Sequence, residues 1–157
     1  MTAMIDRAAS AETAATDARS GTAKVLRLLG ALIMAAGLVL TLSGAATWGL
    51  VQTSLADEKI TVADDAARFA GEPVDGPLTA YYQADIIEKH ALEASGGNTY
   101  AELDREDPRR EVVMNGSFLR ASLFTSIVSF GVAAMAMGLG VLFAATGYAV
   151  RRIGTAL

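Results

Sequence analysis

The chain has 157 residues, of which 52% are apolar, with a mean hydropathy of +0.36, a formal net charge of −4 and no cysteine. This composition is too apolar for an ordinary soluble domain of this length, and the acidic balance argues against nucleic acid as a partner. The absence of cysteine excludes disulfides, thiolate catalysis and Cys-ligated zinc or iron–sulfur sites.

Residues 1–23 are rich in Ala, Thr, Ser and Asp and contain no aromatic residue. They carry no sustained apolar stripe that a tertiary contact would bury. We therefore expect a tail that is disordered or only transiently helical, followed by a helix that begins near Lys24.

The first long apolar segment lies within residues 24–56, where Leu28–Val51 is a run of 24 residues without a charge. About 20 apolar residues suffice for a helix to cross a bilayer, and this run exceeds the apolar core of a signal peptide. It predicts an uncleaved transmembrane helix. Gly30, Gly37 and Gly44 recur every seven residues, with Thr41 beside them. Such a face lets another backbone approach closely, so we predict a helix-packing interface there.

Residues 57–107 form a small acidic region between the two apolar segments. Residues 57–120 hold 14 Asp and Glu against 7 Lys and Arg. A helix is predicted from about Leu78 to Ala94, ended by the Gly96-Gly97 pair. Seven apolar residues are candidates for a small core: Phe69, Tyr81, Ile86, Ile87, Leu92, Tyr100 and Leu103.

The single histidine of the chain, His90, lies in this predicted helix among charged residues. Asp85 and Lys89 have the spacing of a helix salt bridge. One histidine cannot supply a zinc site or the two histidines of a non-haem iron site. We interpret His90 as a surface residue or as a pH-sensitive contact to a partner, with Glu93, Tyr81 and Tyr82 as further candidate contacts. No catalytic, cofactor-binding or metal-ligating residue is predicted.

The second long helix is predicted over residues 108–152, with residues 153–157 as a short tail. Asp107-Pro108 is a typical helix start, and residues 121–150 are 30 residues without a charge. Small residues line one face: Ala133, Ala136, Gly140, Ala144 and Gly147. A neighbouring face carries Gly131, Ala134 and Gly138. Either these small residues reflect ordinary membrane-helix composition, or one face meets the first helix and the other meets a second subunit.

Basic residues flank each apolar segment at the end nearer the chain terminus, namely Lys24, Arg27, Arg151 and Arg152. Because positive residues stay on the cytoplasmic side, we expect both termini in the cytoplasm and residues 57–107 outside the plasma membrane. The predicted fold is all-α: a two-helix transmembrane hairpin with a small extracytoplasmic helical cap.

The stretch KHALEASGGNTYAELDREDPRR, followed by the second apolar segment, resembles a family of small two-span integral membrane proteins of actinobacteria. The similarity covers about residues 58–140. Members often carry the label aromatic ring-opening dioxygenase, which implies iron held by two histidines and a carboxylate. A chain with one histidine does not supply that ligand set, so the resemblance implies the topology and no catalytic residue.

The residues leave three classes of function. We expect a non-enzymatic accessory or assembly component of a cell-envelope complex, with no cofactor, whose partners are membrane lipid and either another protein or further copies of the chain. The first alternative is a membrane-tethered ring-opening dioxygenase, as the family label states. The second is a homo-oligomeric pore, which uncharged spans do not favour, because ion pathways usually need ionisable groups at membrane depth.

Overall fold

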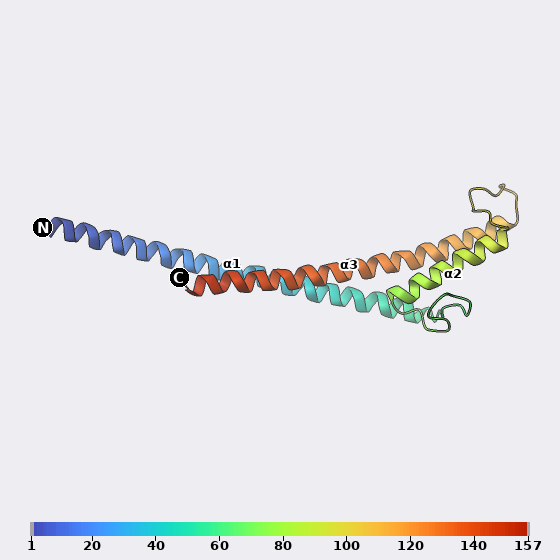
Figure 1. Ribbon diagram of the computed structural model, residues 1–157, viewed down its shortest axis with the longest axis horizontal. Coiled ribbons are helices and arrows are strands. Elements are labelled where there is room, and N and C mark those ends of the chain that lie inside the picture. The colour runs from blue at the N-terminus through green and yellow to red at the C-terminus, as the bar shows by residue number, and fades with distance from the viewer. Residues whose placement is uncertain (1, 157) are drawn as a thin grey trace. The chain divides into compact units, whose positions relative to one another are not determined.

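The computed structural model describes the backbone of residues 2–156 and the side chains of residue 10 and residues 16–156. Within these residues the chain has three helices, α1 (Thr2–Asp57), α2 (Pro77–Ser95) and α3 (Arg109–Ala156), and no strand (Figure 1). α1 and α3 are each long enough and apolar enough to cross a membrane. The prediction of an all-helical chain with two long apolar helices is confirmed.

Both long helices extend beyond their predicted ends. α1 begins at Thr2, whereas the sequence placed a tail before Lys24. Residues 2–23 contain no proline and many alanines, which have the highest intrinsic helix propensity, so nothing local ends the helix. α3 continues to Ala156, so most of the predicted tail 153–157 is helical as well.

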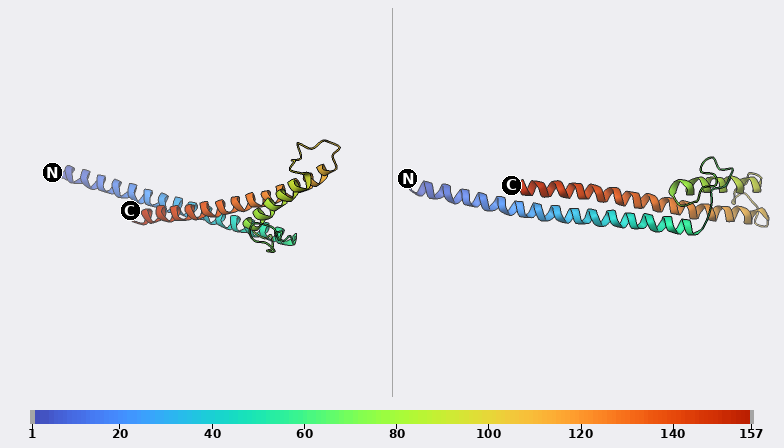
Figure 2. Two further views of the ribbon diagram at one scale, coloured as in Figure 1. Left: turned by 45° about the vertical axis from the view of Figure 1, so that its right-hand side comes forward. Right: turned by 90° about the horizontal axis from the view of Figure 1, so that it is seen from below.

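The chain divides into two compact units, and each long helix contributes to both. Unit 1 comprises residues 1–43 and 136–157, where α1 and α3 lie side by side and antiparallel (Figure 2). Its buried positions recur every seven residues, at Ala23, Gly30 and Gly37 in α1 and at Gly140, Gly147 and Gly154 in α3. A seven-residue repeat keeps the two faces in contact when helices supercoil with a left hand.

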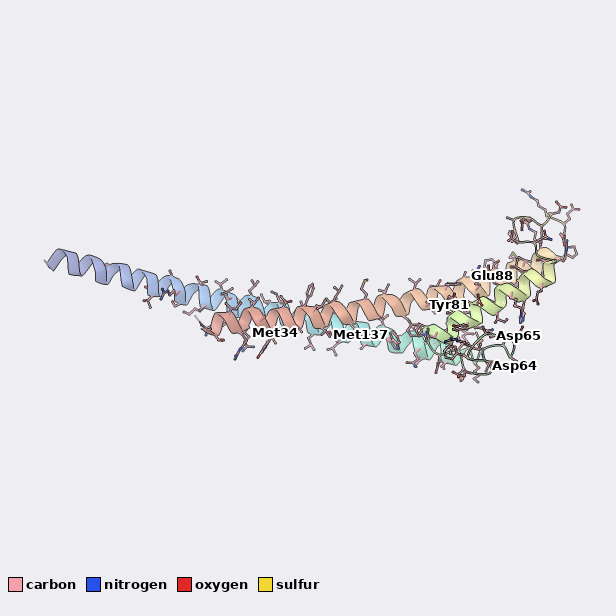
Figure 3. The ribbon with its side chains drawn as sticks, in the orientation of Figure 1. Met34, Asp64, Asp65, Tyr81, Glu88 and Met137 are labelled. Carbon is pink, nitrogen blue, oxygen red and sulfur yellow. The ribbon has the colours of Figure 1, made fainter. Side chains whose placement is uncertain are left out.

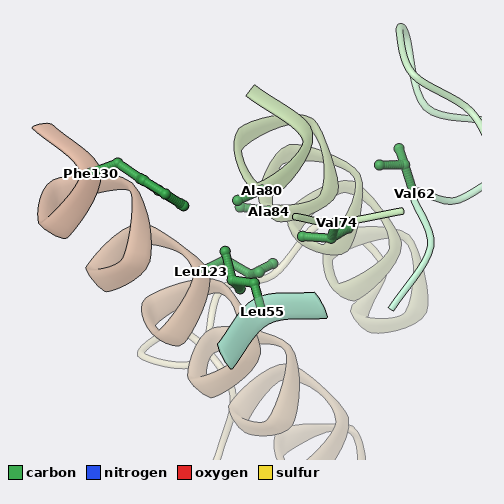
Figure 4. Packing of buried hydrophobic residues seen from close by; sticks show 7 residues of the cluster. All are labelled: Leu55, Val62, Val74, Ala80, Ala84, Leu123 and Phe130. Carbon is green, nitrogen blue, oxygen red and sulfur yellow. The ribbon is translucent and has the colours of Figure 1, made fainter. Parts of the chain in front are cut away.

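Unit 2 comprises residues 44–135 and holds the main hydrophobic core. Its buried cluster draws on all three helices and on the loop before α2 (Figure 4): Leu55, Val62, Val74, Ala80, Ala84, Leu123 and Phe130. Trp48 packs against Phe130 with ring centroids 4.7 Å apart. The region between the long helices therefore shares a core with them instead of forming one of its own.

The predicted small core is only partly correct. Ile86 and Leu103 are buried, but Tyr81 and Tyr100 are exposed. The structure instead buries two alanines of α2, Ala80 and Ala84, and two valines of the loop, Val62 and Val74. Because alanine has a short side chain, α2 can lie close to the core, which leaves its larger tyrosines at the rim.

The loop before α2 is a chain reversal held by backbone hydrogen bonds. The Val62 N–H donates to Glu72 O at 2.9 Å, and the Val74 N–H donates to Ile60 O at 2.9 Å. Gly71 has a φ of 74°, which favours glycine. This reversal brings Val62 and Val74 to the core.

The ends of α2 and the start of α3 follow the local rules that the sequence indicated. Pro77 occupies the first turn of α2, and Gly96, with φ 70°, ends it in the left-handed conformation. Asp107 caps α3 by accepting a hydrogen bond from the Arg109 N–H at 2.9 Å. The Arg109 guanidinium also donates to Ser95 O at 2.9 Å, which ties the end of α2 to the start of α3.

Candidate functional site

One close contact in unit 1 is between the backbones of Gly37 and Gly140. A Cβ on Gly37 would lie 2.5 Å from Gly140 O and 2.6 Å from Ala144 N. A Cβ on Gly140 would lie 2.6 Å from Gly37 O and 2.6 Å from Thr41 N. These distances leave no space for any side chain, so the two helices touch through backbone atoms.

A second layer of the same kind lies one repeat away. A Cβ on Gly30 would lie 2.6 Å from Gly147 O and 2.6 Å from Arg151 N. The reciprocal Cβ on Gly147 would lie 2.5 Å from Gly30 O and 2.6 Å from Met34 N. Two successive layers of paired glycines restrict the register of the helices, because a shift of fewer than seven residues would place a larger side chain in a layer.

A third layer, Ala23 against Gly154, was missed from the sequence. A Cβ on Gly154 would lie 2.9 Å from Ala23 O. The signal was available: Ala23 lies seven residues before Gly30, and Gly154 lies seven residues after Gly147. Both fell in segments predicted as tails, so the series was not extended to them.

The remaining residues of the predicted interface lie in different settings. Thr41 donates its hydroxyl to Gly37 O at 2.9 Å and lies against Gly140. Gly44 and Ala133 are buried in unit 2, and Ala136 is half-buried in unit 1.

The second small-residue face of α3 is open. A Cβ on Gly131 or on Gly138 would meet no described atom within 4 Å. Ala134, between them in the sequence, is exposed.

His90 belongs to a charged cluster that joins α2 to the preceding loop. Its Nε2 lies 2.9 Å from Asp65 Oδ2, and Lys89 Nζ lies 3.3 Å from the same oxygen. Lys89 Nζ also lies 3.9 Å from Glu93 Oε1. The predicted Asp85–Lys89 bridge is wrong, because Lys89 turns to the loop and to Glu93 instead. Asp65 was not recognised as its partner, since local spacing does not reveal a contact made by a folded loop.

This cluster lowers the pKa of Asp65. The hydrogen bond from His90 is the largest cause, desolvation opposes it as the second-largest effect, and the hydrogen bond from Lys89 lowers the pKa further. A depressed carboxyl pKa stabilises the fold above the carboxyl's ordinary value of about 4, and that contribution is lost as the pH falls through the lowered value. The side chains are about half exposed, so the cluster contributes little stability.

The two tyrosines predicted as partner contacts, of which Figure 3 labels Tyr81, lie near the start of α2, eight and nine residues before His90. Tyr82 packs against Phe69 with centroids 5.4 Å apart. Tyr81 meets Tyr82 edge-on at 5.5 Å and Phe124 at 6.3 Å, and it remains 46% exposed. The four candidate contacts therefore form two groups, one charged and one aromatic.

A hollow of about 330 Å³ lies between α2 and α3 in unit 2. Arg120 Nη2 lies 2.7 Å from Glu88 Oε2 at its wall. Gly116 lets the two helices approach, because a Cβ there would lie 2.9 Å from Ala91 Cβ. Gly116 is therefore a point of close contact between the two helices.

Chemically, the site offers packing surfaces and ion pairs. Across the described residues, no group of three or more His, Asp or Glu side chains is placed to hold a metal ion. Comparisons of the chain with family models, with curated proteins and with solved structures find no match. The function is therefore inferred from the residues and their geometry.

Proposed function

We propose that the chain is an integral plasma-membrane protein and a non-enzymatic accessory or assembly component of a cell-envelope complex. The observation that carries this proposal is the exposure of the long helices. In their most apolar 18-residue windows, only 11% of the residues of α1 and 17% of those of α3 are buried. The core helix of a soluble protein would be mostly buried, whereas a membrane helix turns these side chains to lipid.

The distribution of charge supports one orientation. Lys24, Arg27, Arg151 and Arg152 flank the ends of the two apolar segments in unit 1. By the positive-inside rule this end is cytoplasmic, so both termini lie inside. Residues 57–107 then form an acidic extracytoplasmic cap between two spans, the layout of the actinobacterial two-span proteins that the chain resembles.

The accessory role is supported by what the site contains. α3 uses one small-residue face against α1, and its second face, with Gly131 and Gly138, is open. In lipid, small residues let helices approach and gain van der Waals contact. A face of this kind suits another transmembrane helix, from a partner protein or from a second copy of the chain.

The test is purification of the tagged chain from its native membrane in mild detergent, with mass spectrometry of what accompanies it. We expect a stoichiometric membrane partner or a defined homo-oligomer. Replacing both open glycines, by Gly131→Leu and Gly138→Leu, should release it. Gly49→Leu is the matched control, because a Cβ on Gly49 meets no described atom within 4 Å and lies on the other helix. A monomer without a partner would contradict the proposal. Bound iron, with an activity lost on His90→Ala, would favour a ring-opening dioxygenase instead.

A further inference from the structure

A polar hollow of about 360 Å³ lies between α1 and α3 near the chain ends in unit 1. Ala23 and Gly154 line it where the two backbones approach, and neither residue has a side chain long enough to fill it. Its other lining residues are two arginines and three hydroxyl residues: Thr16, Arg19, Ser20, Arg27 and Thr155. Among the side chains that the structure describes, the lining is cationic and contains no acidic residue.

The two arginines differ from the paired cations of unit 2. Arg109 and Arg120 each lie 2.7 Å from a carboxylate oxygen. Neither Arg19 nor Arg27 takes part in an ion pair within the described part of the chain. Arg27 donates its Nε to Ala23 O at 3.2 Å, which holds the side chain at the hollow and leaves the terminal nitrogens for another acceptor.

We infer that this hollow binds the phosphate group of an anionic phospholipid. The inference rests on the proposed membrane function. Guanidinium groups match the oxygens of a phosphate through paired, charge-assisted hydrogen bonds. Because Arg27 immediately precedes the uncharged run that begins at Leu28, it lies at headgroup level when that run spans the bilayer. Membrane position therefore favours a lipid over a soluble phosphate ester.

Charge selects an anionic lipid over a zwitterionic one. The described side chains of the hollow include no carboxylate to accept a choline group, and Lys24, Arg151 and Arg152 add positive charge nearby. The negative end of the α3 dipole amounts to about half a charge, and the two guanidiniums outweigh it. A headgroup without a cation fits this surface best.

The experiment uses the full chain in nanodiscs made of equal amounts of phosphatidylglycerol and phosphatidylcholine. After extraction into mild detergent, native mass spectrometry measures which lipid stays bound. We expect the wild type to retain phosphatidylglycerol in preference. Arg19→Gln with Arg27→Gln should reduce that preference by at least about tenfold, because each lost charge-assisted contact is worth roughly that factor. Arg151→Gln with Arg152→Gln removes the same amount of charge outside the hollow and should keep most of the preference for phosphatidylglycerol.

Three outcomes would overturn the inference. They are an absence of lipid preference in the wild type, an equal loss in the two double variants, and displacement of the lipid by an equal concentration of glycerol phosphate, which would indicate a soluble ligand. Arg19→Lys with Arg27→Lys keeps the charge without the planar fork and should retain an intermediate preference. Resistance to alkaline extraction reports membrane insertion separately. If the wild-type chain is inserted in the membrane but shows no lipid preference, this inference alone is contradicted. If the chain is not inserted, the proposed function is contradicted.

Discussion

The two units of this chain pack by opposite means. In unit 1, α1 and α3 touch through glycine backbones, with Gly37 against Gly140 and Gly30 against Gly147. In unit 2, larger side chains such as Leu55, Val62 and Val74 fill the space between elements, beside the small buried residues Gly44, Ala80, Ala84 and Ala133.

For the part of unit 2 that is proposed to lie outside the membrane, residues 57–107, this difference follows from the solvent, because unit 1 is proposed to meet lipid and this part is proposed to meet water. Between helices in lipid there is no hydrophobic driving force, so association depends on close van der Waals contact, which small residues permit. In water, burial of apolar side chains is the main favourable term. Unit 1 should therefore lose stability when a larger side chain replaces a glycine at the contact. The water-facing part of unit 2 should lose stability when a buried side chain is shortened.

The largest effect is expected from removing atoms in unit 2. Ile86 is 4% exposed, and Ile86→Ala should lower the free energy of unfolding of this region by about 2–5 kcal/mol. Leu78→Ala is the control on the same helix, because Leu78 is 62% exposed. Hydrogen exchange of the α2 amides measures both. Equal protection of α2 in the two variants would show that this region does not depend on side-chain burial.

A smaller loss is expected from adding atoms in unit 1. Gly37→Leu forces the two backbones apart and should cost about 1–3 kcal/mol, or more if the helices separate completely. Gly49→Leu is the control on the same helix, since its Cβ meets no described atom within 4 Å, and removal of glycine from a helix should leave the chain equally or more stable. Unfolding in mixed detergent–SDS micelles measures the difference. If Gly37→Leu were as stable as Gly49→Leu, the backbone contact would not hold this unit together.

The smallest effect on stability is expected at the exposed charged cluster, because its side chains are about half exposed and contribute little to the fold. His90→Ala removes the hydrogen bond that holds the pKa of Asp65 low, so this pKa should rise towards its ordinary value. Glu102 serves as an internal control, because its lowered pKa is due to Thr99. Carboxyl NMR titration follows both groups. If the pKa of Asp65 were unchanged in His90→Ala, the contact between the two side chains would be contradicted.

Features that are specified by one continuous stretch of sequence were predictable. Hydropathy located both long apolar helices, the Gly96-Gly97 pair marked the end of α2, and the seven-residue glycine series marked the face of α1 that meets α3. Such signals are local, because a helix is specified by its own residues and caps.

Features that depend on distant segments were not predictable. The contact of Asp65 with His90 requires the loop to fold back on α2, and the burial of Val62 and Val74 requires the same reversal. The early start of α1 at Thr2 was missed for another reason. Composition indicated disorder for residues 1–23, and the high helix propensity of alanine was given too little weight.

The central claim, a membrane hairpin with both ends inside and an acidic cap outside, has a direct test. The chain contains no cysteine, so single cysteines can be introduced at the exposed positions Ala67, in the proposed cap, and Thr22, before the first apolar run. Intact cells are treated with a membrane-impermeant maleimide, before and after permeabilisation. The account predicts that Ala67→Cys is labelled in intact cells and that Thr22→Cys is labelled only after permeabilisation. Labelling of both positions in intact cells, or the reverse pattern, would contradict it.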